Sequence, residues 1–419
     1  MSKISKVVAR QIFDSRGNPT IEAEVFCNNK SASAICPSGA STGTYEAFEK
    51  RDFNSKKYLG KSVFTAVNII NKKISKKIKN QNVHNQEKID HILIKLDGTK
   101  QKTKLGANSI LAVSMAVKKL SAKLKNISLY KTFINKKNFL LPYPLMNIIN
   151  GGAHANNALR IQEFMIRPDG AKNFSEAIRI CYLIINNLKK ILKNKNLSTS
   201  VGDEGGFAPF IKDNEEALDL IVRAIKLSGF INGKDVSICI DVAANELLKN
   251  NKYSVHSKKF ISPDQTIKKY NSLIKKYKIQ SIEDPFGEND WISWSKFTHK
   301  LKEKIQIVGD DLYATNLERL KIGFLKQTSN SILIKLNQIG TVTETLKVIK
   351  FAHLIGFNTI ISHRSGDSED TFIADFAVGT NSNQIKTGSL SRSERVSKYN
   401  QLLRIEEDLG SKAKMNKIS

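Results

Sequence analysis

The chain has 419 residues, of which 40% are hydrophobic and 25% charged, which is typical of a globular protein with two or three domains and excludes a wholly disordered chain or a small disulfide-linked one. No run approaches the roughly 18 apolar residues that a membrane span needs, and the N-terminus lacks a signal peptide, so we expect a cytoplasmic protein. The formal net charge of +28 suits a protein that binds nucleic acid or another polyanion.

The distribution of this charge favours another explanation. There are 55 lysines but only 12 arginines, and the lysines are scattered in runs rich in Lys, Asn and Ile, such as residues 71–80 and 188–196. These residues share A/T-rich codons. A genome that drifts toward A/T would therefore accumulate them at surface positions that tolerate substitution. The sequence has no zinc finger, RNA-recognition motif or arginine–aromatic block. Binding to nucleic acid or to a surface protein is left open, with no motif to support it.

The first 135 residues are predicted to form an α+β domain. Three runs alternate apolar and polar residues between turn sequences, which predicts an antiparallel meander, and three helical patterns follow. The runs are residues 7–13, 20–26 and 31–36, and the helical patterns are residues 63–79, 87–96 and 107–124. The small-residue loop PSGASTGTYE, residues 37–46, is a candidate mobile lid. The sequence LPYP then breaks the pattern and marks a boundary near residue 140.

The four cysteines, Cys27, Cys36, Cys181 and Cys239, are far apart and form no CxxC pair. They lie in apolar or neutral stretches, which predicts buried, reduced thiols and argues against a zinc site.

Residues 140–419 alternate apolar runs with amphipathic helices, a pattern that predicts parallel strands covered by helices. Six apolar runs end in residues capable of chemistry. These are Asp241, Glu283, Asp310, Lys335, His363 and Lys386, spaced 42, 27, 25, 28 and 23 positions apart. In a closed (β/α)8-type barrel the C-terminal strand ends face one mouth, so all six groups would converge there. The alternative is that each strand simply ends where the sequence becomes polar. In that case the residues at the strand ends would be of mixed types, including Gly and Asn.

Asp241, Glu283 and Asp310 form an all-carboxylate set, which suits Mg²⁺ or Mn²⁺. Three carboxylates in one cleft repel one another unless a divalent cation neutralises them. The alternative is a charge network in which Lys335 and Lys386 pair with these acids.

Further motifs surround these strand ends. The segment VGDEGGFAP contains Glu204 beside two glycines, which allow a tight turn and a close backbone approach. The run NGGAH contains His154 and is followed by QEF. The run HRSG offers Arg364 and Ser365, a combination that suits a phosphate, although a surface loop with a solvated arginine is the alternative.

Taken together, these segments resemble the enolase family. The resemblance rests on SGASTG, NGG-x-H, QEFM, GDEGG, IEDP, GDDL, ILIKLNQIG, SHRSGDSEDTFIAD and IKTGSLSRSER-x-x-KYNQLLRIEE, in order from Asp14 to Glu407. It implies an atypical ββαα(βα)6 barrel at residues 140–419 behind the N-terminal α+β domain. It also implies reversible dehydration of 2-phosphoglycerate to phosphoenolpyruvate, two Mg²⁺ ions per site, and a homodimer or an octamer. A second, secreted or cell-surface pool is left open by the same resemblance.

The resemblance also implies roles for single residues. Lys335 would remove the C2 proton and Glu204 would help hydroxide leave. Asp241, Glu283 and Asp310 would bind the first metal ion, and Ser41 of the lid would reach the second. The implied substrate contacts are His154, Gln162, Glu163, His363, Arg364, Ser365 and Lys386. We also expect neighbouring cations to lower the pKa of Lys335 so that it serves as a base near neutral pH.

The chain departs from the family pattern at Tyr45, Arg160 and Phe210, none of which is an implied catalytic position.

Two other functions are kept as alternatives. One is an acid-sugar dehydratase or cycloisomerase with the same type of barrel, which would share the three carboxylates and the lysine. The other is a non-catalytic scaffold kept for its basic surface, which loss of Lys335 or Glu204 would have supported.

Overall fold

The computed structural model describes residues 2–39, 43–53, 56–134 and 138–418. Its N-terminal part holds a three-stranded antiparallel sheet in the order β1-β2-β3, which confirms the predicted meander. The strands are β1 (Lys6–Phe13), β2 (Pro19–Cys27) and β3 (Lys30–Ile35), and the helices are α1 (Phe64–Ile69), α2 (Ser75–Ile78), α3 (Gln86–Asp97) and α4 (Ala107–Lys125). A π-helical turn, Ile70–Ile74, joins α1 to α2, so the predicted helix over residues 63–79 is one continuous helical segment.

The second part of the chain closes into an eight-stranded barrel in the order β10-β11-β12-β13-β4-β5-β6-β9. The strands are β4 (Tyr143–Asn150), β5 (Glu163–Arg167), β6 (Ser237–Asp241), β9 (Ile279–Glu283), β10 (Gln306–Gly309), β11 (Ser331–Ile334), β12 (Asn358–Ser362) and β13 (Gln384–Lys386). Strand β5 is antiparallel to both of its neighbours, and the other pairs are parallel. A small hairpin of β7 (Leu248–Lys249) and β8 (Lys252–Tyr253) lies outside the barrel.

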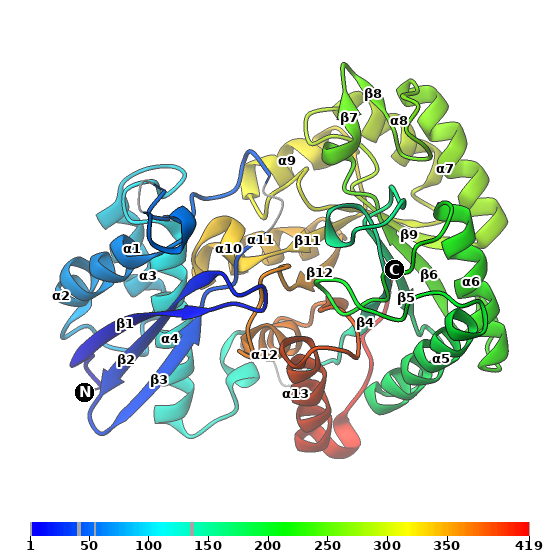
Figure 1. Ribbon diagram of the computed structural model, residues 1–419. Coiled ribbons are helices and arrows are strands. Elements are labelled where there is room, and N and C mark those ends of the chain that lie inside the picture. Colours follow the sequence, from blue (N-terminus) through cyan, green and yellow to red (C-terminus); the bar gives the residue numbers. More distant parts are fainter. Residues whose placement is uncertain (1, 40–42, 54–55, 135–137, 419) are drawn as a thin grey trace.

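Helices cover the outside of the barrel, with the N-terminal sheet and its helices beside it (Figure 1). They are α5 (Phe174–Asn194), α6 (Asn214–Leu227), α7 (Pro263–Tyr277), α8 (Trp291–Leu301), α9 (Leu317–Leu325), α10 (Leu336–Ile339), α11 (Val342–Leu354), α12 (Phe372–Gly379) and α13 (Ser393–Leu409). Two strands followed by two helices and then six strand–helix units make the ββαα(βα)6 order, so the predicted fold class is confirmed.

Strands β4 and β5 are the part of the barrel that the strand–helix alternation did not reveal. The alternation predicted parallel neighbours only, which is wrong for β5, because a loop without a crossover helix turns the chain back after β4. Pro142 and Pro144 at the start of β4 made this stretch look like a break, although proline is tolerated at the first positions of a strand.

The barrel interior explains how the strands present the site. One buried layer is made by side chains from six strands, namely Leu145, Met165, Cys239, Val308, Leu333 and Ile360. Because strand side chains alternate between faces, the residue two positions nearer the mouth also points inward. Those residues are Asn147, Glu163, Asp241, Asp310, Lys335 and Ser362. The apolar interior layer therefore fixes the direction of the polar layer above it.

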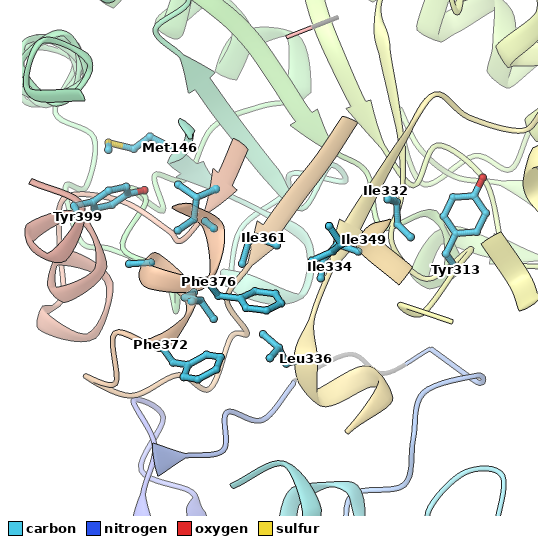
Figure 2. Packing of buried hydrophobic residues seen from close by; sticks show 14 of the residues in the cluster. Met146, Tyr313, Ile332, Ile334, Leu336, Ile349, Ile361, Phe372, Phe376 and Tyr399 are labelled. Atoms are coloured by element: carbon cyan, nitrogen blue, oxygen red, sulfur yellow. The ribbon is translucent and has the colours of Figure 1, made fainter. Parts of the chain in front are cut away.

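A larger apolar cluster packs the barrel against its helices and continues into the N-terminal sheet and its helices. Figure 2 shows part of it, including Ile334 of β11, Ile349 of α11, Ile361 of β12 and Phe376 of α12. All four cysteines are buried and free, as predicted. No helix in the described part of the chain is both long enough and apolar enough to cross a membrane.

Candidate active site

A pocket at the C-terminal ends of the barrel strands brings the predicted residues together. The predicted residues that line it are His154, Gln162, Glu163, Glu204, Asp241, Asp310, Lys335, His363, Arg364, Ser365 and Lys386. Glu283 belongs to the same group through its bonds to Lys386. Ser41, with residues 40–42 of the predicted lid, lies outside the described residues.

Lys386 lies at the centre of one acidic cluster. Its Nζ lies 2.9 Å from Asp241 Oδ2, 2.9 Å from Glu283 Oε1 and 3.1 Å from Glu163 Oε1. Asp241 and Glu283 meet there because they are register partners on the neighbouring strands β6 and β9. Burial and the charge of Asp241 raise the pKa of Glu283 well above its usual value. Burial would lower the pKa of Lys386, but the three carboxylates raise it well above the usual value.

Lys335 forms an ion pair with Asp310, separate from the cluster around Lys386. Its Nζ lies 2.5 Å from Asp310 Oδ2, while Gln338 Nε2 donates to Asp310 Oδ1 at 2.9 Å. Burial lowers the pKa of Lys335, but contact with the Asp310 carboxylate offsets this and leaves the pKa raised. The expectation of a lowered pKa is therefore wrong, because direct pairing with Asp310 outweighs repulsion by Arg364 and Lys386.

The pocket contains oxygen and nitrogen atoms that could serve as ligands of a hard divalent cation. Two groups of side chains have possible ligand atoms within 4.8 Å of one another, namely His154, Glu163 and Glu204, and Asp284, Asp310 and Asp311. In the described chain the predicted trio makes no such group: Asp241 and Glu283 contact Lys386, and Asp310 contacts Lys335 and belongs to the second group. Two buried acceptors nearby, Glu163 Oε2 and Gln162 Oε1, have no hydrogen-bond donor. Carboxylate and amide oxygens without donors are suited to Mg²⁺ or Mn²⁺.

Glu204 and Glu163 form a buried carboxyl pair beside two histidines. His154 Nδ1 lies 3.7 Å from Glu204 Oε2 and 3.8 Å from Glu163 Oε1, and His363 Nε2 lies 3.4 Å from Glu204 Oε1. Burial and the charge of Glu204 raise the pKa of Glu163 well above its usual value. Burial would also raise the pKa of Glu204, but His154 and His363 hold it well below. Of the two carboxyl groups, Glu163 therefore has the higher affinity for a proton.

The loop that carries Glu204 depends on a glycine. Gly205 has φ +85°, and a Cβ atom there would lie 2.5 Å from the Ser391 carbonyl oxygen. The Glu204 carbonyl accepts the backbone N–H of Ser389 at 2.9 Å. The glycine thus lets the loop approach the segment after β13 closely enough to fix the position of Glu204.

Arg364 extends from the loop after β12 towards the predicted lid. Its Nη1 donates to Glu46 Oε2 at 2.9 Å and to Asn337 Oδ1 at 3.0 Å, and the side chain is buried. A Cβ atom on Gly39 would lie 1.9 Å from Arg364 Nη2. The glycine at the start of the lid loop therefore leaves room for the guanidinium beside the pocket.

Sequence reasoning assigned no role to several residues that shape the site. Asp284, which has a left-handed φ of 41°, accepts the backbone N–H groups of Asp310 and Asp311 at 2.9 and 2.8 Å. Burial and the charge of Asp310 raise the pKa of Asp311 to about 7. Both acids lie in the motifs IEDP and GDDL, so their second acidic positions were the available signal. Glu46 ends the quoted lid sequence PSGASTGTYE and Arg395 ends the quoted run IKTGSLSRSER, but neither motif indicates which distant residue its side chain contacts.

The three departures from the family pattern are not among the residues that line the pocket. The Tyr45 ring lies under the Arg319 guanidinium, 3.6 Å from its carbon to the ring centroid, and the Tyr45 hydroxyl donates to Asn289 at 2.8 Å. Arg160 Nε donates to the Ser254 carbonyl at 2.9 Å. Phe210 is 76% exposed.

Comparison with known proteins gives matches along the whole chain. A family model described as "Enolase, N-terminal domain" matches residues 4–133, and one described as "Enolase, C-terminal TIM barrel domain" matches residues 138–419. The chain is also 76% identical over 418 residues to the enolase of Pelagibacter ubique (strain HTCC1062), a match that spans 100% of both chains.

Proposed function

The chain belongs to the enolase family, and from this premise we propose how its own residues divide the reaction between them. The protein is a phosphopyruvate hydratase, which interconverts 2-phosphoglycerate and phosphoenolpyruvate in glycolysis. The matches favour this reaction over that of an acid-sugar dehydratase or cycloisomerase. The observation that carries the division of roles is that Lys335 and Glu204 line one pocket but come from different elements, the end of β11 and the glycine-rich loop.

Lys335 is the proposed base for the C2 proton. It must be neutral to accept this proton, and in this structure Asp310 supports its protonated form. Asp310 would hold a cation, and a carboxylate used in that way would support the ammonium group less. The other influences of burial, Arg364 and Lys386 each disfavour the charged form of Lys335 and would favour the neutral amine that a base requires.

Glu204 is the proposed acid for the departing hydroxide. Its carboxyl needs a proton at that step, and the neighbouring Glu163, whose pKa is raised by burial and by the charge of Glu204, is the proposed source. Transfer within this buried pair supplies the proton without drawing on bulk water. His154, Gln162, His363 and Lys386 line the same pocket and are the proposed contacts to the substrate, while Arg364 and Ser365 bind its phosphate.

Enzymes of this family act with a divalent cation, and the acidic groups of the pocket can hold one. We infer that the ion is Mg²⁺ and that two bind per site. Asp241, Glu283 and Asp310 would hold the first, and Ser41 would serve the second. When bound, the ions act as Lewis acids that stabilise the negative charge developing on the substrate carboxylate.

The metal assignment is tested by following phosphoenolpyruvate formation by its absorbance. Activity should vanish in excess EDTA and return with Mg²⁺. Asp310→Ala should stay inactive at any Mg²⁺ concentration while its circular dichroism spectrum is unchanged. The matched control is Asp264→Ala, which removes an exposed acid of α7 and should leave activity intact. Activity in excess EDTA, or an active Asp310→Ala enzyme, would contradict the assignment, and calorimetric titration with Mg²⁺ counts the sites.

Assembly and domain limits are further proposals. Family membership supports a homodimer, which sedimentation velocity would separate from an octamer. The division into residues 1–135 and 140–419 is supported by the gap between the two family-model matches, at residues 134–137.

A further inference from the structure

Arg395 of α13 is fully buried directly behind the active site. Its Nη1 lies 2.6 Å from His363 Nδ1 and donates to the Arg364 carbonyl at 2.6 Å. Its Nη2 donates to the Ser365 carbonyl at 2.6 Å and to the Asp203 carbonyl at 3.1 Å, with Ser15 Oγ farther away at 3.4 Å. The four N–H groups of the two terminal nitrogens therefore have four short-range acceptors on the two loops that carry Glu204 and His363.

This contact determines which nitrogen of His363 carries the proton. An arginine side chain has hydrogen-bond donors only, whereas a neutral imidazole has one donor nitrogen and one acceptor nitrogen. His363 Nδ1 must accept from Arg395, so its proton resides on Nε2. That nitrogen lies 3.4 Å from Glu204 Oε1 and makes no hydrogen bond to any described residue, so the carboxyl group of Glu204 is the acceptor nearest in charge and distance.

We propose that Arg395 is a positioning residue, which fixes the Nε2–H tautomer of His363 and so places the single N–H of the imidazole on the side of the ring that faces the carboxyl group of Glu204. The inference rests on the proposed role of Glu204 as the acid. The opposite tautomer would present a bare nitrogen lone pair to the Glu204 oxygen and a second N–H to Arg395. Both contacts would be repulsive.

The charges around His363 keep it neutral. The groups that face it are Glu204 from the glycine-rich loop, Arg395 from α13 and Asp367 from its own loop. Burial is the largest influence and, with the positive charge of Arg395, lowers the pKa of His363 to about 4, although Glu204 and Asp367 oppose this. The imidazole therefore stays neutral near neutral pH. Its Nε2–H remains a hydrogen-bond donor, and its Nδ1 takes up no proton.

The guanidinium shape is essential to this role. Lysine keeps the charge but offers its donors from a single nitrogen, which cannot reach His363 Nδ1 and the carbonyls of Arg364, Ser365 and Asp203 together. Arg395→Lys should therefore keep the positive charge but allow His363 to carry its proton on either Nδ1 or Nε2. Arg404→Lys, on an exposed position of the same helix, is the matched control.

The first measurement uses the unmodified enzyme. Its histidine nitrogens are labelled with ¹⁵N, and His363→Gln identifies the His363 signals by their loss. Nδ1 should be bare and Nε2 protonated, with no titration between about pH 6 and about pH 9. A protonated Nδ1 would overturn the inference. This result is obtained even if Arg395→Lys fails to fold.

The second measurement separates positioning from general damage. In Arg395→Lys, turnover should fall by at least about tenfold, as is typical when the partner that orients a site group is lost. Exchange of the C2 hydrogen with D₂O should be retained, because Lys335 is untouched. An equal loss of turnover and exchange would mean that Arg395 is only structural, which would overturn the inference. Normal turnover by Glu204→Gln would instead refute the proposed acid and leave the tautomer measurement standing.

Discussion

At the residue scale, Lys335 and Glu204 reach the pocket from different elements, so their loss should block different steps. Lys335→Ala should lose both turnover and exchange of the C2 hydrogen with D₂O. Glu204→Gln should lose turnover but still exchange that hydrogen, because proton removal does not need the acid. Each loss of turnover should be at least the ~10²–10⁴-fold that is typical of a positioned acid or base. Mass spectrometry of recovered 2-phosphoglycerate measures the exchange. The reverse pattern would mean that the two roles are exchanged.

Arg364 provides a second residue-scale prediction. Lysine at this position keeps the charge but loses the fork that a phosphate needs. Arg364→Lys should therefore reduce kcat/KM by about 10–150-fold, the value of a charge-assisted hydrogen bond of about 1.5–3 kcal/mol. Steady-state kinetics with 2-phosphoglycerate measures this, with Arg404→Lys as the control. An unchanged kcat/KM would place the phosphate elsewhere.

The site residues that could be predicted are those whose position follows from one strand. Asp241, Asp310 and Lys335 come two positions after an interior apolar residue, so the period of two points them into the pocket. Glu46 and Arg395 contribute through partners that are distant in the sequence: Glu46 lies 318 positions from Arg364. No local pattern contains that information. The pairing of each lysine with an acid was foreseen only as the alternative to a metal site.

At the element scale, two glycines with almost the same backbone conformation give a matched comparison. Gly205 has φ +85° and is crowded by Ser391, whereas Gly229 at the end of α6 has φ +83° and no atom within 4 Å of the place that a Cβ atom would take. Gly229→Ala should cost about 1–2 kcal/mol of stability, from the left-handed conformation alone, and leave activity unchanged. Gly205→Ala should cost more and also lower kcat at least about tenfold, because Glu204 must shift.

Urea unfolding and steady-state kinetics of the two variants test this comparison. Equal behaviour of the two alanine variants would mean that the close approach to Ser391 does not position Glu204.

Elements with a strong period were predicted well. The helix α3 extends its predicted range, residues 87–96, by one residue at each end, and α4 extends its predicted range, residues 107–124, by one residue. Strands β4 and β5 were missed, because a hairpin inside a barrel interrupts the strand–helix alternation on which the parallel arrangement was based. The ββαα order therefore depended on resemblance to known proteins.

At the scale of the whole molecule, the charge of +28 is expected to serve no nucleic-acid site, since its lysines are scattered. Non-specific RNA binding should then be lost at physiological salt, because counterion release alone drives it. Filter binding across a salt series measures this. Sequence-selective binding that persists at about 0.3 M salt, where screening is strong, would contradict the expectation.

The pairing that closes the barrel has a consequence for synthesis on the ribosome. Strand β13 joins β4 through Gln384↔Tyr143 and Lys386↔Leu145, so the two strands that complete the ring are made near opposite ends of the barrel's chain. The N-terminal sheet pairs only strands made within the first 35 residues, and it can fold while the rest is being translated. The nascent barrel, in contrast, keeps an open edge on β4 until β13 leaves the exit tunnel, so it depends on protection from aggregation for most of its translation.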